Sequence, residues 1–325
     1  MARTPTFDAQ QRIAQGAWFE ANLAPHHGYA GSAYRVAPEH FLANLAPSIR
    51  EFAECLFGAE PAIQWHQHAN HGLSSQVCCV NFLMPFADKP ALLGRWIEHV
   101  TGDTVAEVLP AEAGRAGRDW FVTFEWIGEK DYLNEAKDGG ARKRGANATA
   151  ADAAVIYRTA AGQTNLLLIE WKYTERYGQP LDPKGNATRR TRYERIYRAP
   201  DGPIRQNANV SLDDFLWEPF YQMLRQQMLA WHTEHDAGNG IDHARVLHIS
   251  PAGNRALHAV TSPPLRRFGE DAFEIFRSLL VDPQDFRSMS VETAFAPLAD
   301  WPEFDWSPWL QDRYASLCAK AGEGA

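Results

Sequence analysis

The sequence lacks the features of a membrane-embedded or secreted protein. No window of its 325 residues approaches the run of about 18 apolar residues that a membrane-spanning helix needs. The first residues, MARTPTFDAQQ, contain no apolar core of the signal-peptide type. Cysteine is scarce: there are four, and the adjacent pair Cys78 and Cys79 is poorly arranged for a disulfide framework. We therefore expect a cytoplasmic protein with no membrane segment.

A positive overall charge is also lacking, because the net charge is −8. This excludes a surface that is basic throughout, but it leaves room for a local basic groove. The chain has no internal repeat and no low-complexity tract. Its hydrophobic content of 45% and aromatic content of 12% are typical of a folded globular protein. The length allows one large domain or two ordinary ones, and we expect one domain over residues 1–325.

The N-terminal part, residues 1–115, is predicted to be a mainly helical layer. A helical period or helical tendency appears over residues 7–22, 47–57, 77–86 and 91–100. Ser74 or Ser75 is a suitable N-cap for the third of these helices.

A strand-rich core, residues 116–250, is predicted next. Alternating, β-branched and aromatic residues indicate a meander of three strands over residues 121–127, 152–159 and 165–173. A helix from Pro219 and a strand over residues 243–250 follow. Residues 251–325 are predicted to be a C-terminal α/β extension, with helices near 270–280 and 309–319 and a short strand near 289–294.

The third strand of the meander ends in charged residues. Side chains alternate along a strand, so Glu170 and Lys172 share a face and Trp171 points the other way. A hairpin centred near residue 161 or 162, at Gly162, places Asp152 opposite Glu170 or Lys172. Two carboxylates on a rigid frame suit Mg²⁺. A neighbouring lysine can orient a water and offset charge on a phosphate, although an ordinary surface ion pair is the alternative.

This Asp … Glu-x-Lys arrangement on adjacent strands resembles the PD-(D/E)xK nuclease superfamily, the restriction-endonuclease-like fold. Asp152 and Glu170-Trp171-Lys172 carry the match, with 17 residues between Asp152 and Glu170. The strings SSQVCCVNFLMPFA, TAADAAVIY, IEWKYTERY and YQMLRQQMLA are similar to a bacterial branch of restriction-endonuclease-like proteins. Ala151 stands where the name-giving motif has proline. The resemblance implies an α/β fold with an αβββαβ core and a mixed central sheet.

The resemblance also implies a metal-dependent nuclease that hydrolyses DNA in bacterial defence or DNA processing, with Mg²⁺ or Mn²⁺ as its cofactor. Asp152, Glu170 and the Trp171 carbonyl would hold the metal, and Lys172 would serve the attacking water. The helix residues Gln222, Arg225 and Gln226 resemble polar residues that such families direct at the site. Glu125 is a candidate extra carboxylate, and an exposed strand residue is the alternative interpretation.

A basic stretch follows the charged strand end, in a segment predicted to be irregular over residues 174–209. Seven Lys or Arg residues lie between residues 184 and 205. Arg189, Arg190, Arg192 and Arg195 are the predicted nucleic-acid contacts. Interleaved tyrosines, Tyr193 and Tyr197, would stack on bases. A solvated flexible loop is the alternative.

Other functions stay open at this level. A zinc site built from His66, His68, His71, Cys78 and Cys79 has ligand-type residues, but their spacing matches no common zinc motif. A nuclease-like fold kept as a silent nucleic-acid-binding or partner module would need no active centre. RNA is an alternative substrate that the same residues would allow, and the chain could form a homo-oligomer.

Overall fold

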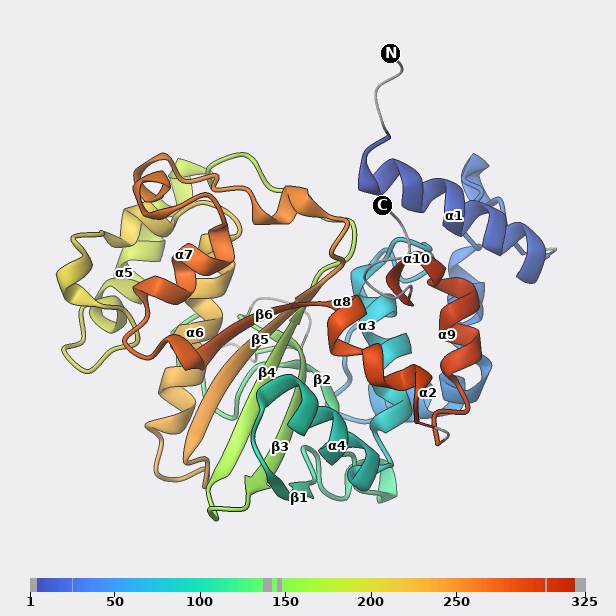
Figure 1. Ribbon diagram of the computed structural model, residues 1–325, viewed down its shortest axis with the longest axis horizontal. Helices are drawn as coiled ribbons and strands as arrows, with labels where there is room; N and C mark the ends of the chain where they lie inside the picture. The colour runs from blue at the N-terminus through green and yellow to red at the C-terminus, as the bar shows by residue number, and fades with distance from the viewer. Residues whose placement is uncertain (1–4, 25, 137–141, 145–147, 302, 319–325) are drawn as a thin grey trace.

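A six-stranded mixed sheet lies at the centre of the computed structural model, with helices on both faces (Figure 1). The structure describes residues 5–24, 26–136, 142–144, 148–301 and 303–318. The strand order is β1-β3-β4-β5-β6, and β2 also pairs with β3. The strands are β1 (Val105–Leu109), β2 (Thr123–Trp126), β3 (Ala151–Thr159), β4 (Thr164–Trp171), β5 (His243–Ser250) and β6 (Phe286–Ser290). The predicted α/β class with a mixed central sheet is confirmed.

The β3–β4 hairpin positions the charged strand end. Gly162 has a φ of +87°, a backbone conformation that favours glycine and lets the chain reverse. The strands then pair antiparallel with Ala153 opposite Ile169. Continuing this register by one residue places Asp152 opposite Glu170, the first of the two predicted alternatives.

Two parallel strands extend the sheet beyond β4. Glu170 pairs with His248 of β5, and His248 pairs with Ser288 of β6. Paired residues of parallel strands point to the same face. Glu170, His248 and Ser288 therefore form one row across the sheet, at the end where all three strands finish.

One face of the sheet is covered by helices from both ends of the chain (Figure 1). These helices are α2 (Arg50–Gly58), α3 (Ser75–Leu83), α4 (Pro90–Thr101), α8 (Val291–Ala294), α9 (Ser307–Arg313) and α10 (Ala315–Cys318). The Ser74 hydroxyl caps α3 by accepting a hydrogen bond from the Val77 amide at 3.3 Å, as predicted. Trp171 is buried on this face against Phe82, with ring centroids 5.3 Å apart. This aromatic packing anchors the strand end that carries Glu170 and Lys172.

Helix α1 (Phe7–Asn22) packs beside the C-terminal helices, so segments far apart in the sequence lie side by side. The Trp18 indole donates a hydrogen bond to Asp312 at 2.7 Å and packs edge-on against Trp309. None of the helices in the described ranges is long and apolar enough to cross a membrane.

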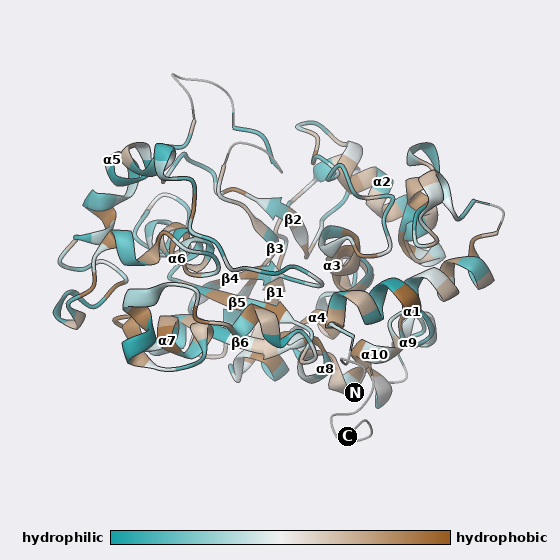
Figure 2. Ribbon diagram, turned by 90° about the horizontal axis from the view of Figure 1, so that it is seen from above, coloured by the Kyte–Doolittle hydropathy of each residue, from teal (hydrophilic) through white to brown (hydrophobic). Residues whose placement is uncertain are grey.

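The opposite face is covered by α5 (Asn186–Tyr197), α6 (Phe220–Glu234) and α7 (Ala272–Leu279). The apolar side of α6, including Met223, Leu224 and Met228, is buried against the sheet. Its N-terminal turns lie beside the end of β4, which brings α6 polar residues to the charged centre. Figure 2 shows the hydrophilic character of α5 at the periphery of the same layer.

Three local predictions differ from the structure in part. Residues 174–209 are not irregular throughout, because α5 forms within them. Tyr193, Ile196 and Tyr197, spaced three and four residues apart, give α5 an apolar stripe that packs into the core. The short strand expected near residues 289–294 is present but lies over Phe286–Ser290, and the Ser290 hydroxyl at its end caps the short helix α8. Residues 1–115 contain α1 to α4, as expected for a mainly helical segment, and also the strand β1.

A second polar cluster lies at the opposite end of the β3–β4 hairpin. Arg245 on β5 contacts the Asp103 carboxylate at 3.0 Å, and the Tyr157 hydroxyl donates a hydrogen bond to the same carboxylate at 2.6 Å. The Asn165 amide lies 3.4 Å from it. Asp103 precedes β1, so this cluster ties the edge of the sheet to its centre.

Candidate active site

The charged end of β4 is a compact centre of two carboxylates and one ammonium. The Lys172 ammonium contacts the Glu170 carboxylate directly and lies 3.8 Å from the Asp152 carboxylate. Asp152 Oδ2 also accepts a hydrogen bond of 2.7 Å from the Trp171 amide across the hairpin. The three side chains are 17%, 5% and 11% exposed for Asp152, Glu170 and Lys172. The alternative of a solvated surface ion pair does not fit this burial.

The charges of this centre do not balance, because one ammonium faces two carboxylates. Burial raises the pKa of Glu170 to about 8, and the charge of Asp152 adds to that effect. Burial also raises the pKa of Asp152 to about 6, against the opposing charge of Lys172. Burial disfavours the charge of Lys172, yet Glu170 and its other anionic neighbours outweigh burial and hold its pKa well above the usual range. The excess of carboxylates over ammonium groups therefore favours the binding of a further positive charge at this centre.

Gln226 of α6 reaches the centre from the helical layer. Its Nε2 donates hydrogen bonds to Glu170 Oε2 and, at 3.0 Å, to the Ala150 carbonyl. Its Oε1 is buried and has no hydrogen-bond partner within the described residues. A buried oxygen left unpaired on a side chain that contacts Glu170 is suited to a ligand or water at the centre.

The other two predicted α6 residues do not touch the carboxylates. Gln222 accepts a hydrogen bond of 3.3 Å from the Tyr177 hydroxyl. Arg225 turns toward Thr149, to which it donates at 3.0 Å, and its guanidinium lies 4.6 Å from the Tyr221 ring centroid. The helix spacing correctly places the three residues on one side of α6, but only Gln226 contacts Glu170.

Glu125 is buried, not exposed, and it has its own set of partners. It adopts a φ of +50°, in the left-handed region that non-glycine residues seldom occupy. Its Oε1 accepts a hydrogen bond of 2.8 Å from Gln76 Nε2 and lies 3.1 Å from His66 Nε2. The contact with Glu125 raises the pKa of His66, and the charge of Asp152 contributes in the same direction. Glu125 and His66 thus border the carboxylate centre.

Gln76 and the position of His66 at this centre were missed from the sequence. Gln76 lies in the first turn of α3, where it looks like one more residue of a buried helix. His66 lies in a histidine-containing loop that suggested zinc. Neither has a sequence pattern linking it to β2, so only the packing of α3 against the sheet brings them to Glu125.

The zinc alternative finds no support in the structure. Within the described residues, no group of three or more His, Cys, Asp or Glu side chains is placed to hold a metal ion. Cys78 and Cys79 are fully buried in α3, and burial raises the pKa of both thiols. The His71 ring instead accepts a hydrogen bond of 3.0 Å from the Leu73 amide.

A divalent cation fits the carboxylate centre on chemical grounds. Asp152 and Glu170 are hard oxygen donors, and the unpaired Gln226 Oε1 adds a third oxygen nearby. A site with two carboxylates that retains several waters is usual for Mg²⁺. Burial raises the pKa of both carboxylates, and such a cation would favour their charged forms.

The basic residues of α5 differ in their freedom to bind a ligand. Arg190 is paired with Asp213 at 2.7 Å, Arg189 donates to the Asp182 carbonyl at 2.8 Å, and Arg192 lies 3.4 Å from the Glu135 carbonyl. Arg195 is exposed and has no ion pair within the described part of the chain.

The α5 tyrosines are not available for base stacking, which corrects the sequence prediction. Both rings are buried. The Tyr193 hydroxyl donates to Glu135 at 2.6 Å, and the Tyr197 hydroxyl donates to the Val210 carbonyl at 2.7 Å. They serve the core because they lie on the apolar stripe of the helix.

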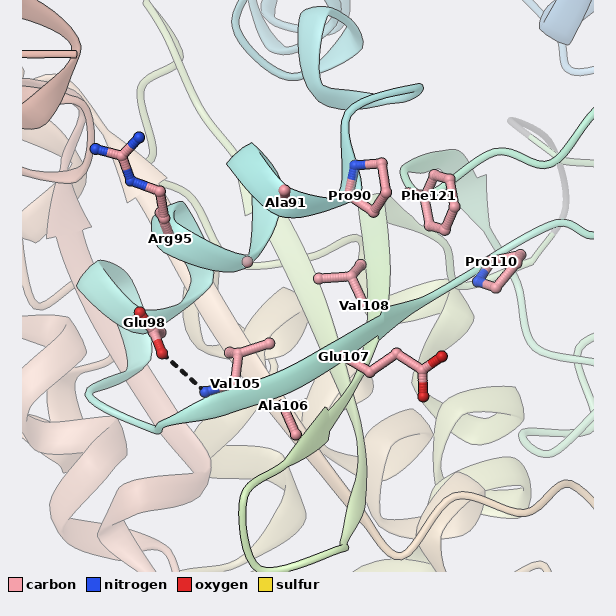
Figure 3. Close-up of a pocket in the computed structure, with 11 residues that line it drawn as sticks. Pro90, Ala91, Arg95, Glu98, Val105, Ala106, Glu107, Val108, Pro110 and Phe121 are labelled. Carbon is pink, nitrogen blue, oxygen red and sulfur yellow. Dashed lines mark hydrogen bonds between the residues drawn. The ribbon is translucent and has the colours of Figure 1, made fainter. Parts of the chain in front are cut away.

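A hollow elsewhere on the molecule lies between α4 and β1 (Figure 3). It has a volume of about 550 Å³ and is lined by residues such as Arg95, Glu98 and Phe121. Glu98 accepts a hydrogen bond of 3.0 Å from the Val105 amide at its floor. None of the candidate site residues lines it, so it is separate from the carboxylate centre.

Comparison with known families supports the restriction-endonuclease resemblance. A model of the family described as "Restriction Endonuclease associating with ARP" matches residues 12–315. The chain belongs to this family. Its mixed α/β sheet agrees with a restriction-endonuclease-like fold, and membership supports a nuclease-type function that involves nucleic acid. No curated protein and no solved structure matches the chain significantly.

Proposed function

We propose that this member of the restriction-endonuclease family is a metal-dependent nuclease of the PD-(D/E)xK type that hydrolyses phosphodiester bonds of DNA. The observation that carries the proposal is the under-neutralised centre of Asp152, Glu170 and Lys172. The two carboxylates and the ammonium lie at the end of a buried strand, and the pKa of both carboxylates is raised. Genome defence or DNA processing would use such an activity.

Asp152, Glu170 and the Trp171 carbonyl would hold Mg²⁺ or Mn²⁺. When bound, the ion neutralises phosphate charge and lowers the pKa of a coordinated water. Lys172 donates hydrogen bonds to the attacking water and orients it toward the phosphorus, and its positive charge stabilises the charge that develops on the phosphate oxygens. Gln226 holds the Glu170 carboxylate in place through its amide.

The test is cleavage of plasmid and linear DNA with Mg²⁺ or Mn²⁺. We expect wild type to cut, and Lys172→Ala and Asp152→Ala to lose at least about 100-fold in rate, since each removes charge or a ligand at the reacting phosphate. Arg245→Ala is the matched control, because it removes a partly buried cation that is paired with Asp103 at the other end of the hairpin.

The control should retain cleavage within a few-fold of wild type. Equal activity of Lys172→Ala and wild type would overturn the site assignment. If Arg245→Ala loses as much activity as Lys172→Ala, the losses reflect general destabilisation of the fold and not removal of a catalytic group. An RNA substrate run in parallel separates a DNA nuclease from an RNA-directed one. Absence of cleavage of both substrates by wild type would contradict the proposed function.

A further inference from the structure

A second polar pocket lies at the ends of β5 and β6, beside the candidate active site. Its volume is about 410 Å³, and its lining includes Ser250, Arg255, His258, Asp271 and Ser288. Ser288 belongs to the row that runs from Glu170 through His248, so this pocket and the carboxylate centre open on the same face of the sheet. The separation of β4 from β6 is two strand spacings, about 10 Å.

The acidic side chains around this pocket already have hydrogen-bond partners within the protein. Asp271 caps α7 by accepting hydrogen bonds from the amides of Phe273 and Glu274, at 2.9 and 3.1 Å. The same carboxylate lies 2.7 Å from His258 Nδ1. Glu292, which follows β6, accepts a hydrogen bond of 3.0 Å from the Ala252 amide. These hydrogen bonds leave Arg255, the Ser250 hydroxyl and the outer edge of His258 as the groups that can bind a ligand.

The available groups of the pocket are polar side-chain atoms without a partner in the described residues. With its Nδ1 facing Asp271, His258 has its Nε2 on the other side of the ring, free of partners within the described residues. Arg255 has neither an ion pair nor a side-chain hydrogen bond to any described residue. The hydroxyl of Ser250 adds a further group at the strand end, whereas the Ser290 hydroxyl already accepts a hydrogen bond of 3.0 Å from the Thr293 amide. An arginine and a hydroxyl can donate hydrogen bonds to the oxygens of a phosphate group, and the open edge of the His258 ring lies beside them.

The side chains behind these polar groups are closely packed. His248 is buried, stacks on Phe273 with ring centroids 4.1 Å apart, and lies 3.1 Å from the Ser288 hydroxyl. His258 packs edge-on against the same Phe273 ring at 4.9 Å. Because His258 is held by both Asp271 and Phe273, its orientation is set before any ligand binds.

We propose that this pocket binds a phosphodiester of the nucleic-acid strand within about two nucleotides of the bond that is cut. The proposal rests on the proposed nuclease function, and it assigns Arg255 and His258 as contacts that position the substrate. Inorganic phosphate offers the same oxygen chemistry, so the experiment has to separate the two sources.

The experiment measures binding of a fluorescent single-stranded oligonucleotide by fluorescence anisotropy, in a Lys172→Ala background that prevents cutting. We expect Arg255→Gln to weaken binding about tenfold, because a charge-assisted hydrogen bond is lost. The slope of log affinity against log salt should decrease by about 0.7, since one phosphate contact is lost. Arg158→Gln is the matched control: it removes one exposed arginine at the far end of β3. Thermal unfolding of each variant verifies folding.

Neutral methylphosphonate linkages, introduced one at a time along the oligonucleotide, then locate the contact. The effect of Arg255→Gln should vanish with the neutral linkage at a single position near the cut. An Arg255→Gln variant that binds like Arg158→Gln, while wild type still cuts DNA, would overturn the pocket assignment and leave the nuclease function standing. Wild type that binds inorganic phosphate through Arg255, but no oligonucleotide, would overturn the nucleic-acid assignment. Wild type that binds oligonucleotide through Arg255 without cutting would support the pocket and count against the nuclease.

Discussion

The two ends of the β3–β4 hairpin each hold a cation among acidic side chains, but the charges are balanced at only one end. At the turn end, Arg245 forms its ion pair within the described residues with Asp103, at 3.0 Å. Burial works to raise the pKa of Asp103, but the Tyr157 hydrogen bond and Arg245 outweigh it and lower that pKa. At the other end, Lys172 faces both Asp152 and Glu170, and the pKa of each carboxylate is raised.

This difference separates a cluster that stabilises the fold from one that costs stability. A paired carboxylate with a lowered pKa favours the folded state at neutral pH, whereas a buried carboxylate with a raised pKa disfavours it. Proteins retain such unfavourable arrangements mainly at functional sites. The comparison therefore gives a physical reason, independent of the family match, for placing the function at Asp152 and Glu170.

The largest expected contrast between the two ends is in the response to a metal ion. Mn²⁺ at about 100 times its dissociation constant should raise the free energy of unfolding of wild type by about 2.7 kcal/mol. Arg245→Met should keep this increase, and Asp152→Asn should lose most of it. Urea unfolding with and without Mn²⁺ measures the effect. The same increase in the Asp152→Asn variant would place the ion elsewhere.

A smaller contrast is expected in stability without metal. Glu170→Gln should raise the free energy of unfolding by about 1 kcal/mol, because it removes a buried carboxylate whose raised pKa disfavours the folded state at neutral pH. Asp103→Asn should lower it by about 1–2 kcal/mol, because it leaves Arg245 without its counter-charge. Urea unfolding in EDTA measures both changes. If the two substitutions shift stability in the same direction, the charge imbalance at the Glu170 end is not what distinguishes it.

The smallest expected contrast between the two ends is in how the free energy of unfolding depends on pH. Burial raises the pKa of Glu170 from 4.5 to about 8, so the folded state binds a proton that the unfolded state has released between these values. Stability should therefore fall as pH rises through this window. Asp103 acts in the opposite sense: with a lowered pKa, its stabilisation is lost as pH falls through its folded pKa.

Urea unfolding in EDTA between about pH 5 and about pH 8 compares wild type with Glu170→Gln and Asp103→Asn. The fall in stability with rising pH should be shallower in the Glu170→Gln variant and unchanged in the Asp103→Asn variant. Parallel curves for wild type and Glu170→Gln would mean that Glu170 does not titrate in this window.

Much of the arrangement around β4 follows from local rules. The period of two along a strand places Glu170 and Lys172 on one face, and the glycine at 162 predicts a hairpin that returns Asp152 to them. In the helix that follows Pro219, the three- and four-residue spacing of the polar residues places them on one side. These features depend on backbone geometry and on residues close in sequence, so a sequence is sufficient to predict them.

Other features depend on which surfaces meet. Helix α5 is strongly basic, and its short apolar stripe favours a helix only once the core of the α6 layer is present to bury it. Strand β1 has only five residues and pairs with β3 alone, so its alternation is too brief to stand out. In both cases long-range packing, which a local pattern does not contain, selects the structure.

The sequence by itself determined the charged end of β4 and the return of Asp152 to it, because both follow from strand periodicity and one turn. Only the tertiary structure decided that these charges are buried, that Gln226 is the α6 residue that contacts them, and that Glu125 lies between Gln76 and His66. Burial is the physical reason for the difference. It arises when α3, α6 and the sheet pack together, and it raises the pKa of the two carboxylates.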